Sequence, residues 1–325
     1  MSSITISAPV KPHPNLRPLS IFRDLPPVAD LIEQCFSSTM DNDGRRYIQD
    51  MRRAGGDHGF LQWANRVADS TSLPLTGFVW EEDHRIIGNV SLVPFRRNKH
   101  RLYLIANVAV HPEHRRRGIA RALTLHAMQH AREKNIDDLW LHVRADNFDA
   151  IPLYQSLGFV ERARRTQWQA VTSQHLDMPQ TDIAVEGRHP RYWAVQSHWL
   201  SRLYPDHLGW HANWNLSMLR PGFLTWLKNM FMDMNVRQWA AVRRNNLLAT
   251  LSWIPTGRGE SLFAATGARS DPEALTLLLV HARRELHYSH PRIQLDFPTG
   301  PFDNAIEAAG FKIHRTLLWM QATSA

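Results

Sequence analysis

The stretch HPEHRRRGIARAL, residues 111–123, places three arginines directly before a glycine and then becomes apolar. It follows LYLIANVAV (102–110), whose continuous apolar character is typical of a strand buried on both faces. Beyond the glycine, apolar residues recur every four positions and predict a helix with one buried face: Ile119, Leu123, Ala127 and Ala131. The arginines therefore lie where a buried strand turns into a helix.

A helix that begins at this turn offers a binding place for an anion. Its first backbone N–H groups have no partner within the helix, and the helix dipole adds positive charge at the same point. Phosphate oxygens satisfy both. Gly118 lets the backbone approach such a group, Ala120 adds little bulk, and charge-assisted donors come from Arg115, Arg116, Arg117 and Arg121. The turn thus predicts a pyrophosphate site; the alternatives are a solvated basic turn and a nucleic-acid contact.

Composition sets the frame for this site. The chain has 325 residues, 43% of them hydrophobic and 21% charged, which indicates a globular protein of one or two domains. The formal net charge of +8 fits an anionic ligand. A single cysteine, Cys35, excludes an intramolecular disulfide and fits a reducing compartment. We find no signal peptide and no membrane-spanning run, and we expect a cytoplasmic protein.

The second half of the chain repeats the first. RIIGNVSLVP (85–94) aligns with NLLATLSWIP (246–255) at an offset of 161, and ALTL occurs at 122–125 and again at 274–277, at an offset of 152. Two ungapped blocks in the same order indicate two copies of one fold. The predicted organisation is a loose tail over 1–15, a first domain over 16–172, a linker over 173–181 and a second domain over 182–325.

Within this organisation, three features carry further predictions. Two short strand-like runs, LTGFVWE (75–81) and IIGNVSLVPF (86–95), are separated by EDHR and predict a hairpin. DAIPLYQSL (149–157) predicts a short helix with Asp149 as its N-cap. The segment 207–235 interleaves aromatic residues with methionines. We expect it to pack in the second core and at the interface of the domains, although it could also line a substrate groove at that interface or touch a membrane surface.

Two motifs resemble a known family. RRRGIA (115–120) fits the Arg/Gln-x-x-Gly-x-Gly/Ala signature of the GNAT superfamily of acyl-CoA N-acyltransferases. LHVRADNFDAIPLYQSLGF (141–159) resembles the motif that follows it in that family, Asn-x-x-Ala-x-x-Leu-Tyr-x-x-x-Gly-Phe. The resemblance covers about residues 16–170. It implies an α/β (α+β) fold of two GNAT-like domains, each a mixed, mostly antiparallel sheet flanked by helices, and acetyl-CoA as co-substrate.

The resemblance also implies roles for individual residues. The pyrophosphate of coenzyme A would lie on the turn and the helix start, at Arg115, Arg116, Arg117, Gly118, Ile119, Ala120 and Arg121. The backbone of Val108, Ala109 and Val110 would follow the pantetheine and the acetyl oxygen, where an N–H acts as an oxyanion donor. Asn147 matches a cofactor-binding position, with helix capping as its alternative role. Tyr154 matches the tyrosine that protonates the departing thiolate, and its phenol is protonated at neutral pH.

One departure concerns the general base. Many relatives carry a glutamate on the fourth strand, and Ala106 occupies its place here; the next residue, Asn107, cannot act as a base. The remaining candidates are His142, Glu81 and Glu82, together with a water chain or an amine that arrives uncharged. We expect His142 to be a core residue.

The second copy has lost the motifs. At the offset of 152, RRRGIA falls on GARSDP (267–272), Asn147 falls on Thr299, and Tyr154 falls on Ile306, which has no proton to donate. This copy is predicted to keep the fold without binding coenzyme A.

Taken together, these patterns predict an N-acetyltransferase that moves an acetyl group to a primary amine by direct attack in a ternary complex. The alternatives are a non-catalytic acyl-CoA sensor and a nucleic-acid-binding protein. The acceptor would be a small-molecule or peptide amine, and we do not expect nucleic acid as a partner. No zinc-ligand spacing occurs in the sequence, so we predict no metal. The identity of the amine and the oligomeric state are left open.

Overall fold

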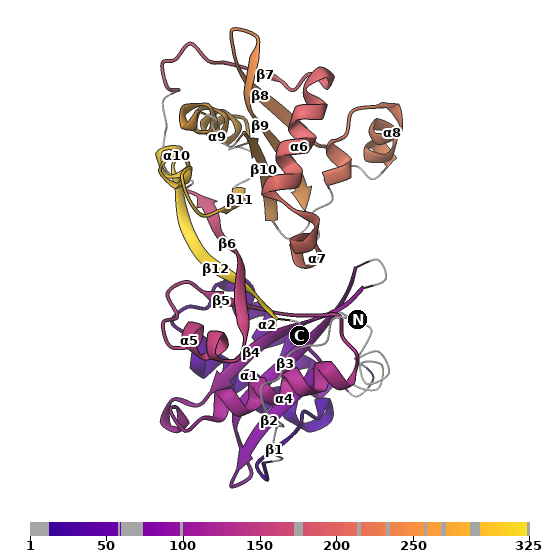
Figure 1. Ribbon diagram of the computed structural model, residues 1–325, viewed down its shortest axis with the longest axis vertical. Helices are drawn as coiled ribbons and strands as arrows, with labels where there is room; N and C mark the ends of the chain where they lie inside the picture. Colours follow the sequence, from indigo (N-terminus) through magenta and orange to yellow (C-terminus); the bar gives the residue numbers. More distant parts are fainter. Residues whose placement is uncertain are drawn as a thin grey trace. The chain divides into compact units, whose positions relative to one another are not determined.

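The chain forms two compact units in the computed structural model, which describes residues 13–57, 59, 74–97, 100–171, 178–212, 216–231, 235–256, 259–267, 271–286 and 293–323 (Figure 1). Unit 1 comprises residues 1–162 and 318–325, and unit 2 comprises residues 163–317.

The sheet of unit 1 is antiparallel from β1 to β4 and parallel between β4 and β5. Its strands follow in the order β1 (Leu16–Pro18), β2 (Thr76–Glu82), β3 (Arg85–Arg97), β4 (His100–Val110), β5 (Asp138–Arg144) and the end of β12 (Phe311–Ala322). Its helices are α1 (Ile21–Phe36), α2 (Asn42–Gly56), the short 3-10 helix η1 (Pro112–His114), α4 (Ile119–Glu133) and α5 (Ala150–Ser156).

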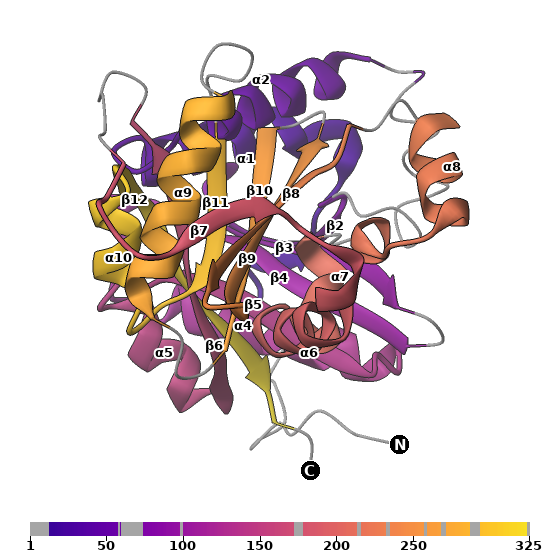
Figure 2. The ribbon, with the colours of Figure 1, turned by 90° about the horizontal axis from the view of Figure 1, so that it is seen from above.

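Helices cover both faces of this sheet, with α4 on one face and α1 and α2 on the other (Figures 1 and 2). The alternation of β2 explains this layering, because neighbouring side chains of a strand point to opposite faces. Phe78 and Trp80 pack in the cluster that contains α4, whereas Val79 packs with α1 and α2. The four residues predicted to form the apolar stripe of α4 are all buried: Ile119, Leu123, Ala127 and Ala131. The predicted helix is confirmed.

The predicted hairpin of β2 and β3 is also confirmed, and its turn is tight. Asp83 and His84 form the turn with positive φ angles of 48° and 58°. Two successive left-handed residues match the right-handed twist of the strands that they join.

Unit 2 repeats this layout. Its strands follow in the order β7 (Ala184–Gly187), β8 (Arg237–Arg243), β9 (Asn246–Thr256), β10 (Gly259–Thr266), β11 (Ile293–Pro298), β6 (Phe159–Ala170) and β12. Its helical elements are η2 (Pro190–Tyr192), α6 (Trp193–Leu203), η3 (Asp206–Leu208), α7 (Gly209–Ala212), η4 (Leu216–Leu219), α8 (Phe223–Phe231), α9 (Pro272–Leu286) and α10 (Asp303–Ala308). The pairing of β10 with β11 is parallel, and β7 to β10 are antiparallel, as in unit 1. Helices α6 and α9 lie on opposite faces of the strands (Figures 1 and 2).

The last strands of the two repeats are exchanged. β6 follows α5 of the first repeat, yet its residues 165–169 pair with β11 of the second. β12 follows α10 of the second repeat, yet its end lies beside β5, where Gln321 Nε2 donates to Asp138 Oδ1 at 2.6 Å. Each unit therefore contains a strand from the other repeat, and the chain passes from one unit to the other within β6 and again within β12.

The predicted fold class, with a mixed and mostly antiparallel sheet flanked by helices in each half, is confirmed. The predicted domains 16–172 and 182–325 follow the order of the repeats, whereas the compact units contain the exchanged strands. Most of the predicted tail over 1–15 and of the linker over 173–181 lies outside the described residues.

The aromatic segment 207–235 only partly follows its prediction. Leu208, Met218 and Leu219 are buried, but Phe223 and Phe231 of α8 are 69% and 79% exposed. The expectation that this whole segment packs in the core is therefore wrong for α8. None of the helices in the described residues has the length and apolar character needed to span a bilayer.

Candidate active site

The site begins where β4 leaves its neighbour β5. The parallel ladder between them runs from Leu102–Asp138 to Ile105–Leu141, and residues 106–110 of β4 lie beyond it. On the other side, the pairing with β3 shifts between Asn89 and Ser91, which marks a β-bulge. Asn107 within this bulge has a φ of 52°. Residues 106–108 are half-exposed, although the rest of β4 from Leu102 onward is buried. The strand is thus opened at its centre.

The predicted strand-to-helix turn follows directly. Arg116 has a φ of 62°, and Gly118, the N-cap of α4, has a φ of 79°. A Cβ added at Gly118 would find no atom within 4 Å, so the glycine serves the backbone conformation and faces open space. The first intrahelical bond runs from Ala122 N to Gly118 O. The N–H groups of Ile119, Ala120 and Arg121 therefore lie before the helical ladder begins, where an anion is favoured.

The four arginines of the turn have different partners. The Nε atom of Arg115 lies 3.3 Å from the carbonyl oxygen of Val110. Arg116 pairs with Asp149 at 3.3 Å, and both side chains are almost fully exposed. Arg117 binds both carboxylate oxygens of Glu82, at 3.1 and 2.8 Å. Arg121 donates to Ser156 Oγ at 2.7 Å. The cations are therefore gathered around the helix start, each on an exposed side chain that a ligand can reach.

Asn147 caps the helix that carries Tyr154. Its Oδ1 accepts a hydrogen bond from Ala150 N at 3.2 Å, which is the capping role that the sequence left open. Asp149, predicted as the N-cap, makes no side-chain capping bond and pairs with Arg116 instead. Asp149 therefore stands at the predicted N-cap position, and the side chain that makes the capping bond is that of Asn147.

Tyr154 points into the core of unit 1. It is 7% exposed and lies edge-on to Phe159, with ring centroids 6.1 Å apart. Burial raises the pKa of its phenol to about 12. The group therefore keeps its proton over the whole physiological range and can act as a proton donor.

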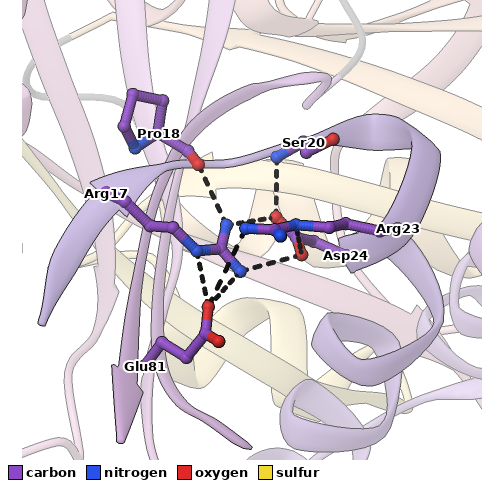
Figure 3. A network of polar contacts seen from close by, with 6 residues as sticks. All are labelled: Arg17, Pro18, Ser20, Arg23, Asp24 and Glu81. Carbon is purple, nitrogen blue, oxygen red and sulfur yellow. Dashed lines mark hydrogen bonds and ion pairs between the residues drawn. The ribbon is translucent and has the colours of Figure 1, made fainter. Parts of the chain in front are cut away.

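The three candidate bases have structural partners. Glu81 is bound by Arg17, which also holds the buried Asp24 at 2.6 Å (Figure 3). Glu82 accepts from Trp80 and Arg117, and these bonds lower the pKa of its carboxyl group. A lowered pKa makes a carboxylate a weaker base. The ring of His142 lies 4.2 Å from that of Trp319.

A cluster of neutral polar side chains that was not among the predicted site residues lies at the bulge: Tyr47, Asn89 and Ser91 around Asn107. Asn89 and Ser91 are fully buried and stand two residues apart on β3, so they share one face of the strand. Their presence within the apolar run IIGNVSLVPF is a signal that the sequence contains. Tyr47 comes from α2, and no sequence pattern links it to β4.

Two further groups lie near the turn. The Cys35 thiol donates to the carbonyl of Val110 at 3.3 Å, and burial raises the pKa of this thiol. His111, Glu113 and His114 bring ligand atoms within 4.8 Å of one another. Arg117 Nη1, however, lies 2.7 Å from His114 Nδ1, so a metal ion would face a guanidinium. The absence of a metal site stays a prediction.

Unit 2 fills the corresponding region with its own side chains. The parallel ladder of β10 with β11 ends at Leu262–Leu295. Beyond it, Ala264 N donates to the hydroxyl oxygen of Tyr204, a buried group whose pKa is raised by burial. The buried Arg165 lies over the Tyr204 ring and binds Asp296 at 2.6 Å. Ile306, the counterpart of Tyr154, is fully buried.

Part of the first half of the chain is similar in sequence to known acetyltransferases. Residues 32–159 match the family model described as Acetyltransferase (GNAT) family. The [ribosomal protein bS18]-alanine N-acetyltransferase of Escherichia coli K12 is 42% identical over 66 residues, 20% of this chain and 45% of that protein. The mycothiol acetyltransferase of Kocuria rhizophila is 28% identical over 146 residues, 44% of this chain and 45% of that protein. This chain thus spans less than half the length of each of these curated relatives.

A solved structure resembles the whole chain. The GCN5-related N-acetyltransferase from Sphaerobacter thermophilus aligns with a TM-score of 0.57 and 13% identity, over 96% of this chain and 97% of that one. This likeness shows the fold of both units. The family model covers the part of the chain that carries the turn and the bulge, and this part is similar to the acetyltransferase (GNAT) family.

Proposed function

We propose that unit 1 is an acetyl-CoA-dependent N-acetyltransferase that moves the acetyl group to a primary amine by direct attack. The observation that carries this proposal is the left-handed Gly118 at the open start of α4, directly after a strand that has separated from its neighbour. These features supply an anion site and an unpaired strand edge next to each other.

The helix start and the arginines would hold the diphosphate of acetyl-CoA. The backbone N–H groups of Ile119, Ala120 and Arg121 would donate to its oxygens, and Gly118 would let them approach. Arg115, Arg116, Arg117 and Arg121 would add charge. Asn147, whose Oδ1 is used for capping, would contribute through its remaining amide donor.

The backbone of Val108, Ala109 and Val110 would lie along the pantetheine and the acetyl group. Acetyl-CoA supplies a thioester, whose carbonyl carbon is open to attack. A β4 backbone N–H would stabilise the negative charge that develops on the carbonyl oxygen. The amine nitrogen forms a bond with the carbonyl carbon, and the carbon–sulfur bond breaks.

Tyr154 would complete the reaction as general acid. Its phenol gives its proton to the departing thiolate, and the proton that the nitrogen loses replaces it, so that the products are an amide and a free thiol. A phenol whose pKa is raised to about 12 remains available as a donor at every pH at which the amine is reactive.

The acceptor would be a small-molecule or peptide amine. The bS18 relative is named for an alanine of a ribosomal protein, and the Kocuria relative for mycothiol. A cytoplasmic location belongs to this proposal and rests on the single cysteine. Unit 2 would not bind coenzyme A, because its strand separation is filled by Tyr204 and Arg165.

Calorimetry with acetyl-CoA, together with free-thiol release on a panel of amines, tests the proposal. Arg115→Ala with Arg117→Ala should weaken acetyl-CoA binding and leave the turnover of the saturated enzyme nearly unchanged. Tyr154→Phe should do the reverse, with kcat lowered about 10²- to 10⁴-fold. Equal loss of affinity in both variants would contradict these roles. Binding without turnover on any amine would favour a non-catalytic acyl-CoA sensor.

A further inference from the structure

The bulge of β4 is held in shape by a buried amide. Asn89 Nδ2 donates to the backbone carbonyl of Asn107 at 2.9 Å, and it also lies 3.2 Å from Ser91 Oγ. Asn89 is fully buried, so water does not compete for these bonds. The left-handed backbone of Asn107 is a conformation that asparagine tolerates better than most residues do. Asn89 therefore fixes the place from which the Asn107 side chain extends.

The side chain of Asn107 is oriented in turn by Tyr47. Asn107 Nδ2 donates to the Tyr47 hydroxyl oxygen at 2.8 Å and lies 3.5 Å from Ser91 Oγ. Because the Nδ2 atom is directed at these oxygens, the Oδ1 atom faces the other way. No donor to this Oδ1 occurs among the residues that the structure describes. Asn107 is half-exposed and next to Val108, whose backbone belongs to the proposed acetyl site.

The cluster at the bulge is uncharged. Asparagine and serine do not titrate at these pH values, and burial raises the pKa of Tyr47 to about 12. Asn107 Oδ1 can accept a hydrogen bond from an amine, but it cannot take its proton. An amine placed here must therefore already be uncharged when it attacks.

The titratable groups of the surrounding elements have partners of their own. On α1, Glu33 is bound by Arg52 of α2, and the Cys35 thiol donates to Val110 O. On β5, His142 lies against Trp319. The further charged groups Asp30 on α1 and Asp50 on α2 pair with arginines of α2 on the outer surface.

We propose that Asn107 seats the acceptor amine in its uncharged form, with Tyr47 and Asn89 as positioning residues, and that the acceptor is a weakly basic amine of the α-amino type rather than a lysine side chain. This inference rests on the proposed function. Near pH 7.4 the uncharged fraction of an α-amine exceeds that of a lysine ε-amine by a few hundredfold, since their ordinary pKa values are about 7.8 and 10.4. With no base beside Asn107, this ratio favours the α-amine, and the higher intrinsic nucleophilicity of the more basic lysine amine offsets part of it.

Three probes distinguish a small α-amine, the N-terminus of a peptide and a lysine side chain as the acceptor. They are alaninamide, a tetrapeptide with a free N-terminal alanine and no lysine, and the same peptide with a blocked N-terminus and one lysine. At pH 7.4 the rate with either α-amine probe should exceed that with the lysine probe by at least about tenfold. The α-amine rate should rise with pH up to about 8.5 and then level off, in step with the titration of the amine. Comparable rates on the lysine probe at pH 7.4 would overturn the proposal.

Variants test the proposed binding place of the amine at Asn107 and Tyr47, which we call the seat. Tyr47→Phe removes the hydroxyl, and Asn107→Gly removes the amide while allowing a positive φ. Each should raise the KM for the α-amine probe about tenfold, the equivalent of one lost hydrogen bond, and leave acetyl-CoA affinity within twofold. Asn107→Asp keeps the backbone preference and adds a carboxylate, so it should shift the pH profile to lower pH. Tyr192→Phe, a matched loss of a hydroxyl in unit 2, should change neither constant. An unchanged KM and pH profile in the Tyr47 and Asn107 variants would overturn the proposal.

Calorimetry separates this proposal from the proposed function. If no probe is acetylated, peptide binding to the complex with coenzyme A is measured in the wild type and in Tyr47→Phe. Binding that Tyr47→Phe weakens supports the seat, although transfer has failed. Binding that is absent, or that Tyr47→Phe leaves unchanged, overturns the seat. Transfer that proceeds equally in all variants overturns the seat and leaves the proposed function intact.

Discussion

At the scale of single residues, burial sets the chemistry of the two tyrosines near the site. Tyr47 and Tyr154 both lie in places where the phenolate would lose its hydration, and the pKa of each is raised to about 12. One consequence is for the reaction, since both phenols carry their protons at neutral pH and neither begins the reaction as a base. The other is for stability, since both groups must be protonated in the folded chain.

The pH–rate profile follows from Tyr154. Its phenol should stay protonated well above pH 10, so kcat on an α-amine probe should show no decline between pH 8 and 10. A profile that falls in this range with a pKa near the ordinary tyrosine value of about 10 would contradict the burial of the donor.

Stability should depend on the same group at alkaline pH. Between pH 10 and 12 the folded chain keeps a proton on Tyr154 that the unfolded chain has lost, so the free energy of unfolding must fall as the pH rises through this window. The contribution is fully present below pH 10. Urea unfolding of the wild type and of Tyr154→Phe should show a shallower alkaline decline in the variant. Parallel curves would mean that this tyrosine does not contribute.

At the scale of elements, each repeat has an ion pair between the end of a strand and the start of a helix, and the charges are the other way round in the second repeat. In unit 1, Arg117 of the turn binds Glu82 at the end of β2. The offset of 161 pairs position 82 with Arg243, at the end of β8, and the offset of 152 pairs position 119 with Asp271. Arg243 binds Asp271 at 3.0 Å, and it also pairs with Asp182. Both units thus have a contact between a strand end and a helix start. In unit 2 the carboxylate stands at the helix start and the arginine at the strand end.

This reversal predicts how the Glu82–Arg117 pair affects ligand binding. Glu82→Gln removes a carboxylate that competes for Arg117, so acetyl-CoA should bind about two- to fivefold more tightly, in keeping with the strength of an exposed pair. The exchanged variant, Glu82→Arg with Arg117→Glu, keeps a pair but removes the cation from the turn and should bind more weakly.

The repeat supplies a control for this experiment. Arg243→Gln breaks the corresponding pair in unit 2 and should leave acetyl-CoA affinity unchanged in calorimetry. If Glu82→Gln instead weakens binding, the carboxylate orients Arg117 toward the ligand rather than competing with it.

At the scale of the whole molecule, the exchanged strands make the repeats dependent on each other. Leu318 and Met320 belong to the second repeat by sequence, yet they are buried in the core of unit 1 together with Leu139 and Leu141. Leu318→Ala should therefore lower the free energy of unfolding by about 2–5 kcal/mol. In hydrogen exchange, it should also reduce the protection of the amides of β5.

Another residue on the same strand provides the matched control. Ile313 of β12 is 53% exposed, and Ile313→Ala should change stability by less than about 0.5 kcal/mol. If Leu318→Ala reduced the protection of β11 and spared β5, the exchange of strands would be contradicted.

Much of the fold could be predicted from local patterns. The four-residue stripe from Ile119 to Ala131, the β2–β3 hairpin and the short helix that carries Tyr154 all form where the sequence places them. Each depends on neighbours within a few residues, through periodicity and turn chemistry. The capping by Asn147 instead of Asp149 is a local detail that the pattern leaves open, since both residues are good caps.

The sequence by itself determined the repeat, the arginine–glycine motif at the strand-to-helix turn and the loss of that motif in the second copy, because these are properties of consecutive residues. Only the tertiary structure decided which strand completes which sheet and which side chains meet at the β4 bulge. The four residues of that cluster come from α2, β3 and β4, and Tyr47 lies 60 positions from Asn107. Such contacts depend on packing and on the burial of hydrogen bonds. Both are properties of the whole folded chain rather than of any one segment.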